Sequence, residues 1–91
     1  MTNTQLDILK KYSYTIALSN VLYERKRQDE KWGVQNHDPL KWQAIILEEL
    51  GEAAKDLLEN KVWQYRDEMV QIAAVALAAI ECFDRSHDVN S

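Results

Sequence analysis

The chain has few of the residues that interrupt helices, with 2 glycines and 1 proline among 91 residues. Turns in proteins depend heavily on these two residue types, so there are few places where the chain can reverse direction. The scarcity predicts an all-α fold built from a few long helices. A chain of this length forms one small domain, here residues 1–91, which buries proportionally less surface than a larger protein. Its hydrophobic fraction of 46% is nevertheless ordinary for a globular domain.

The chain also lacks a second cysteine and a surplus of positive charge. Cys82 is its only cysteine, which excludes a disulfide within one chain and fits a reduced, cytoplasmic setting. The net charge of −4 argues against non-specific binding to nucleic acid, which needs a basic surface. The short basic run at residues 25–27 does not change this expectation, because three residues make only a small basic patch on a helix face.

The sequence shows neither a secretory signal nor a membrane span. Residues 1–5 are polar and lack the apolar core of a signal peptide. The most apolar stretch, residues 69–83, is interrupted by Gln71 and Glu81 and is shorter than the ~20 residues that a span requires. These features predict a soluble protein.

Apolar spacing of three and four residues predicts a first helix over about 4–31, weakest at residues 12–14 and ended by Gly33. The second helix is expected over Pro39 to Leu58. Its start carries the clearest boundary signal in the chain, because Asp38 can cap the helix and Pro39 suits the first helical position.

A third helix is expected over about 62–85, after a tight connection at Asn60, and residues 86–91 are expected to fray. So short a connection predicts that the second and third helices run antiparallel. The segment 72–80 of the third helix is apolar on every side and should therefore be buried on every side. A well-packed monomer core and a subunit interface are both possible. We expect the interface, with three long helices per chain and a four-helix-bundle core completed by dimerisation, as a dimer or a dimer of dimers.

Carboxylates stand inside the otherwise apolar second helix. Glu52 lies one turn beyond Glu48 and Glu49 and shares a face with both, and the antiparallel connection can bring Glu68 of the third helix alongside. One interpretation is a solvated acidic edge, and the other is a set of oxygen ligands for a divalent cation. Such ligands favour Mg²⁺ or Mn²⁺ over zinc or copper, and no histidine stands three residues after a helical glutamate, as it does in di-iron bundles. Magnesium is commonly shared with substrate phosphates, which predicts a phosphorylated substrate.

Two motifs resemble those of the MazG-like all-α nucleoside triphosphate pyrophosphohydrolases and the related dCTP pyrophosphatases. The first is Glu48-Glu49-x-x-Glu52 followed, after fifteen residues, by Glu68-x-x-Gln71. The second, just ahead of it, is Arg25-x-x-x-Asp29-Glu30-Lys31-Trp32-Gly33-x-Gln35-x-His37-Asp38-Pro39. The similarity covers roughly residues 23–85, which is most of the chain.

The resemblance implies hydrolysis of nucleoside triphosphates to monophosphate and pyrophosphate with Mg²⁺, or Mn²⁺ in its place, in the house-cleaning of the nucleotide pool. By position, Glu49, Glu52 and Glu68 match metal ligands, and Glu48 matches the leading glutamate of the motif. Gln71 stands where the family usually has aspartate, and a neutral amide is the poorer magnesium ligand, acting directly or through a water. Glu48 or Glu49 could orient the attacking water.

Substrate contacts are assigned to aromatic and basic residues around the acidic motif. A tryptophan such as Trp32 or Trp42 could stack on a base, although core packing is the commoner role of this residue. His37 could hydrogen-bond a base or be an ordinary loop histidine. The phosphate candidates, which could equally be paired surface residues, are Arg25, Lys31 and Lys55. The alternative function is a non-catalytic helical module that binds nucleotide, metal or a protein partner.

Overall fold

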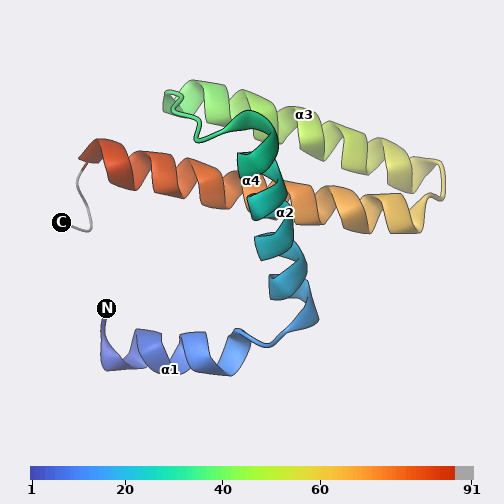
Figure 1. Cartoon of the computed structure of the whole chain (residues 1–91). Helices are drawn as coiled ribbons and strands as arrows, with labels where there is room; N and C mark the ends of the chain where they lie inside the picture. Colours follow the sequence, from blue (N-terminus) through green and yellow to red (C-terminus); the bar gives the residue numbers. More distant parts are fainter. Residues whose placement is uncertain (88–91) are drawn as a thin grey trace.

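The computed structural model describes residues 1–87, and this part of the chain is entirely helical outside its turns and loops (Figure 1). Its helices are α1 (Asn3–Tyr12), α2 (Ile16–Trp32), α3 (Pro39–Leu58) and α4 (Val62–His87). The predicted all-α class is confirmed. Within residues 1–87, no helix combines the length and the apolar character needed to cross a membrane.

The predicted single helix over 4–31 is wrong, because α1 and α2 are separate helices. The break falls at the predicted weak point, where polar side chains satisfy backbone groups that a continuous helix would pair internally. The Ser13 hydroxyl donates to the carbonyl of Lys10 at 3.2 Å. Thr15 caps α2, since its hydroxyl accepts a hydrogen bond from the backbone N–H of Leu18 at 3.2 Å.

The loop between α2 and α3 has the boundaries that the sequence predicts. Gly33 ends α2 with a φ of 73°, which a residue with a side chain rarely adopts. Asp38 caps α3 by accepting from the backbone N–H of Lys41 at 3.0 Å. The Arg85 guanidinium of α4 donates to the carbonyl of Gln35 and to Asn36 Oδ1, at 3.1 and 3.0 Å. The loop is thereby fastened to the end of α4.

Helices α3 and α4 lie side by side and antiparallel, and α2 crosses α4 near its middle (Figure 1). Asn60 makes the reversal between α3 and α4 possible by adopting a φ of 59°, in the left-handed region that asparagine tolerates. The predicted bounds of α3 are confirmed, while α4 continues two residues beyond the expected end at Arg85. Of the tail predicted to fray, residues 88–91 lie outside the described part of the chain.

The chain buries little of its apolar surface by itself. The buried hydrophobic residues of the described chain are Trp42, Ala53, Ala74 and Cys82. Every residue of α1 is exposed, and Figure 1 shows this helix standing apart from the α3–α4 pair. Even the apolar segment 72–80 of α4 is mostly half-buried. The chain therefore presents apolar faces to its surroundings.

Candidate metal centre

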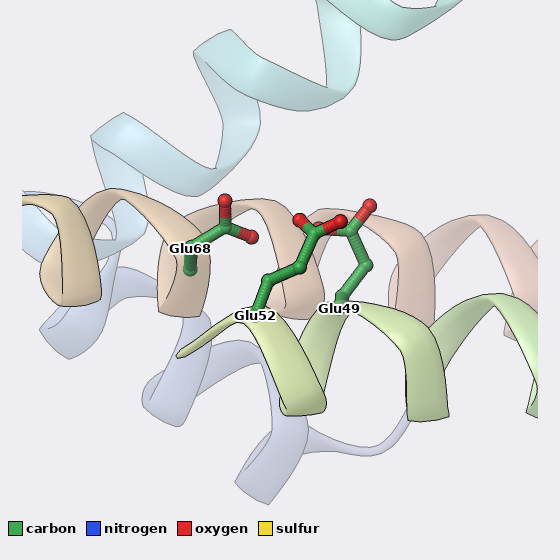
Figure 2. A group of neighbouring side chains, drawn as sticks. All are labelled: Glu49, Glu52 and Glu68. Atoms are coloured by element: carbon green, nitrogen blue, oxygen red, sulfur yellow. The ribbon is translucent and has the colours of Figure 1, made fainter. Parts of the chain in front are cut away.

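Three carboxylates converge where α3 and α4 lie side by side; Glu49 and Glu68 are half-buried and Glu52 is exposed. Glu49 and Glu52, one turn apart on α3, reach towards Glu68 on α4 (Figure 2). One carboxylate oxygen from each of the three lies within 4.8 Å of the others. The antiparallel connection thus brings Glu68 back to the two glutamates of α3, as predicted.

The surroundings of Glu68 make its negative charge costly. Among residues 1–87, the buried oxygens Glu49 Oε2 and Glu68 Oε2 have no hydrogen-bond partner. Burial, followed by the neighbouring carboxylate of Glu49, raises the pKa of Glu68 to about 7. Asp56 and Asp67 raise this pKa further through their negative charge.

This donor set fits a divalent cation. Buried carboxylate oxygens without partners cost free energy unless a proton or a cation satisfies them. Oxygen-only ligands suit magnesium, manganese or calcium, and magnesium commonly takes a few carboxylates and fills its remaining positions with water and phosphate oxygens. Glu49, Glu52 and Glu68 would hold such an ion between α3 and α4.

A cleft of about 390 Å³ adjoins the carboxylates. Helix α3 lines it with Trp42, Ile45 and Glu49, and α4 lines it with Gln71, Val75 and Ala78. Helix α2 and the start of the following loop form the opposite wall, with the residues Glu24, Arg25, Arg27, Gln28, Asp29, Lys31, Trp32, Gly33 and Gln35. A cavity of this size can hold a small organic molecule.

Arg25 lines the cleft, but its guanidinium already has carboxylate partners. It donates to Asp29 on its own helix and to Glu81 on α4, at 3.0 Å for the closer Glu81 oxygen. These two carboxylates raise the pKa of Arg25 against the opposing effect of its burial. Arg25 therefore links α2 to α4 and shapes the cleft wall. Glu81, which interrupts the apolar stretch of α4, is thereby paired with a cation from α2.

Trp32 and Lys31 stand together at the rim of the cleft. Trp32 is 60% exposed, and Lys31 Nζ lies 4.8 Å from the centroid of its ring. An exposed ring next to a cleft can stack on a planar ligand. Of the two tryptophans predicted to contact substrate, Trp32 has the accessible ring.

Trp42 and His37 pack against one another behind the cleft. Trp42 is 6% exposed, and its ring meets that of His37 edge to face at 4.9 Å between centroids. The backbone carbonyl of His37 accepts a hydrogen bond from the Cys82 thiol at 3.4 Å. Trp42 is thus a core residue that also contributes to the cleft floor, and His37 lies outside the cleft lining.

Glu48 and Lys55, the remaining predicted site residues on α3, are both exposed and lie outside the cleft lining and the carboxylate cluster. Gln71, predicted as a fourth metal ligand, is half-buried and lines the cleft beside Glu49.

Sequence reasoning missed the polar wall that α2 contributes, including Glu24, Arg27 and Gln28. Glu24 and Arg27 form an ion pair of 2.7 Å along the helix, which lowers the pKa of Glu24. Their i, i+3 spacing is a readable signal for that pair. The crossing of α2 over α4, which turns this face towards the cleft, has no comparable local signal.

Comparisons of this chain with protein-family models, with curated proteins and with solved structures gave no match.

Proposed function

We propose that this protein is a divalent-cation-dependent nucleotide pyrophosphohydrolase, which converts nucleoside triphosphates to monophosphates and pyrophosphate. The observation that carries the proposal is the convergence of Glu49, Glu52 and Glu68, with oxygens within 4.8 Å of one another, at the edge of a 390 Å³ cleft. The resemblance of the two sequence motifs to MazG-like enzymes supports the same activity.

The metal expected at this position is Mg²⁺, with Mn²⁺ as a substitute. When bound, such an ion supplies neutralisation of the triphosphate charge and activation of water. Glu49 and Glu52 would hold it from α3, and Glu68 from α4. The antiparallel pair brings these oxygens together without a bound substrate, which favours catalysis by positioning.

The chain's own contribution to the chemical step is a carboxylate that orients water and takes up its proton. The water oxygen forms a bond to the α-phosphorus, the bond from that phosphorus to the bridging oxygen breaks, and pyrophosphate leaves with the electron pair. Glu49 is the better placed base, because it belongs to the cluster and also lines the cleft. Glu48 would take this role only where substrate extends to the exposed side of α3.

The cleft would hold the nucleoside. Its interior includes the apolar side chains of Ile45, Val75 and Ala78, which suit a flat base, and the exposed ring of Trp32 stands at its rim. Lys31, beside Trp32, is positioned to meet a phosphate oxygen or the base.

We further propose that the protein works as a homodimer, or as a dimer of dimers. Large apolar side chains remain exposed on the protomer along both helices of the central pair. They include Leu40, Leu47, Leu50, Leu57 and Leu58 of α3 and Ile80 and Phe83 of α4. A symmetric second copy is the commonest way to cover such faces.

The alternative is a helical module that binds metal and nucleotide without turnover. Gln71 supports this alternative without turnover, because an amide at this position contributes no negative charge to a metal site. The two functions predict the same binding and differ only in hydrolysis.

The test is release of pyrophosphate from a panel of ribo- and deoxyribonucleoside triphosphates, with Mg²⁺, with Mn²⁺ and with a chelator. Metal-dependent formation of monophosphate and pyrophosphate in equal amounts is expected. Metal-dependent nucleotide binding without any cleavage would support the module, and the absence of both would reject the proposed site.

A further inference from the structure

Gln71 stands at the boundary between the carboxylate cluster and the cleft. It follows Glu68 by one turn on α4 and lines the cleft together with Glu49 of α3. In the described part of the chain, Glu52 and Glu68 lie outside the cleft lining. Gln71 is therefore the first polar side chain of α4 that a ligand meets on passing from the carboxylates into the cleft.

The two helices change character turn by turn along the cleft. On α4 the residues at successive turns are Glu68, Gln71, Val75 and Ala78, and on α3, read backwards, they are Glu52, Glu49, Ile45 and Trp42. One turn further along α4 corresponds to one turn back along α3, because the helices are antiparallel. From the cluster into the cleft, these positions thus pass from the carboxylates of Glu52 and Glu68, through Glu49 and the amide of Gln71, to apolar residues. Each step is about 5.4 Å, the scale of one sugar ring.

This gradient matches the order of groups in a nucleotide, which is phosphate, then sugar, then base. With the phosphates held at the carboxylates, the sugar falls at the level of Gln71 and the base at the level of Val75 and Ala78. A glutamine amide both donates and accepts hydrogen bonds, so it can donate a hydrogen bond to a hydroxyl or accept one from it. It also adds no negative charge beside the phosphates, whereas a fourth carboxylate would repel them.

We propose that Gln71 is a specificity-determining residue, which hydrogen-bonds a sugar hydroxyl of the bound nucleotide and is not a metal ligand. This inference rests on the proposed function. The three carboxylates of Glu49, Glu52 and Glu68 then form the complete protein ligand set, with water and phosphate oxygens in the remaining positions of the ion.

The test compares the wild-type protein with Gln71→Leu, which has a similar size and no hydrogen-bonding group. Gln64→Leu, the same change at an exposed position of α4 outside the cleft lining, is the control. Two measurements separate an effect on metal binding from an effect on recognition of the sugar. The first is the rise in melting temperature during a Mg²⁺ titration without nucleotide. The second is calorimetric affinity, in Mg²⁺, for α,β-imido analogues of ribo-, 2′-deoxy- and 2′,3′-dideoxynucleoside triphosphates of the four common bases, and for inorganic tripolyphosphate.

In wild type and the control, removing the contacted hydroxyl should weaken binding about tenfold, the effect of one buried hydrogen bond. In Gln71→Leu the same removal should change affinity less than twofold, while the Mg²⁺ midpoint and the tripolyphosphate affinity stay at wild-type values. A several-fold loss of Mg²⁺ affinity in Gln71→Leu, or a gain in Gln71→Asp, would show that Gln71 is a ligand and overturn the inference. Undiminished discrimination between the sugars in Gln71→Leu would overturn it as well. Wild-type protein that binds Mg²⁺ but none of the nucleotides would instead reject the proposed function, and this inference with it.

Discussion

Glu68 carries a buried carboxylate oxygen beside Glu49, and burial together with that neighbour raises its pKa from 4.5 to about 7. At neutral pH the folded protein therefore holds a proton there for part of the time, while the unfolded chain does not. A cation at the proposed site would compete with this proton for the same oxygens, so metal binding should depend on pH.

We expect the metal-free protein to lose stability as pH rises from about 5 to 8. A carboxyl group whose pKa is raised on folding favours the folded state fully below its unfolded pKa, and this contribution disappears as pH passes the folded pKa. For Glu68 the window runs from 4.5 to about 7. The loss should be on the order of 2–3 kcal/mol at most. Urea unfolding at several pH values in the presence of a chelator measures this loss of stability. Glu68→Gln should abolish the dependence of stability on pH over this range.

Mg²⁺ should stabilise the protein more strongly at pH 8 than at pH 5, since the cation needs the deprotonated cluster. Stabilisation by mass action amounts to about 2.7 kcal/mol at a hundredfold excess over the dissociation constant. Glu52→Gln and Glu68→Gln should each lose most of this effect and the turnover with it. Glu48→Gln is the matched control for metal binding, because Glu48 is exposed and lies outside the cluster. Full Mg²⁺ stabilisation in Glu52→Gln would contradict the assignment of the ligands.

At the scale of the helices, Gly51 lies inside α3 between Glu49 and Glu52, two residues of the cluster. A Cβ built at this position meets no atom within 4 Å. Glycine costs a helix interior roughly 0.5–1 kcal/mol relative to alanine, so Gly51→Ala should raise the free energy of unfolding by about that amount. Gly33→Ala should lower it by about 1–3 kcal/mol, because the φ of 73° at Gly33 strains any side chain. A destabilised Gly51→Ala protein would indicate that a second chain packs closely on this face of α3.

The helix boundaries that could be predicted are those with a chemical signal in the local sequence. Gly33, Asp38 and Asn60 each mark an end or a reversal, and the structure confirms all three. The division of the first helix was harder to predict, because Thr15 is a capping residue inside an apolar periodicity that continues on both sides. At this break, the hydrogen bonds made by the side chains of Ser13 and Thr15 outweigh the apolar periodicity that favours one continuous helix.

The carboxylate cluster could be predicted because one short connection determines it. Once α3 and α4 run antiparallel, Glu68 has to return towards Glu52. The cleft could not be predicted in the same way, since its wall depends on how α2 crosses α4. The ion pair of Arg25 with Glu81 joins positions 56 apart, and no local pattern reports such a contact.

For the molecule as a whole, exposed apolar surface predicts self-association. Leaving four or five large apolar side chains in water costs on the order of 5–10 kcal/mol, which rivals the stability of a small domain. We expect light scattering to show at least twice the chain mass of 10.6 kDa at micromolar concentration. A folded monomer under these conditions would contradict the dimer.

A charge placed on the exposed apolar face of α4 should weaken this association. Ile80 is 56% exposed in the protomer, so Ile80→Glu costs the isolated chain little but buries a charge in a dimer. The variant should dissociate at concentrations where the wild type is associated, with lower helicity or a lower melting temperature. Ser19→Glu, at an exposed position of α2, should leave the wild-type mass unchanged.

The carboxylate cluster and the cleft also differ in the length of the chain segment that must close to form them. Fifteen residues separate Glu52 from Glu68, whereas the Arg25–Glu81 pair that holds α2 over α4 spans 56 positions. Short loops close at lower entropic cost and usually earlier in folding. The α3–α4 hairpin should therefore form in the transition state, and α2 should dock afterwards. In stopped-flow experiments Mg²⁺ should then accelerate folding, while a nucleotide in the cleft should mainly slow unfolding.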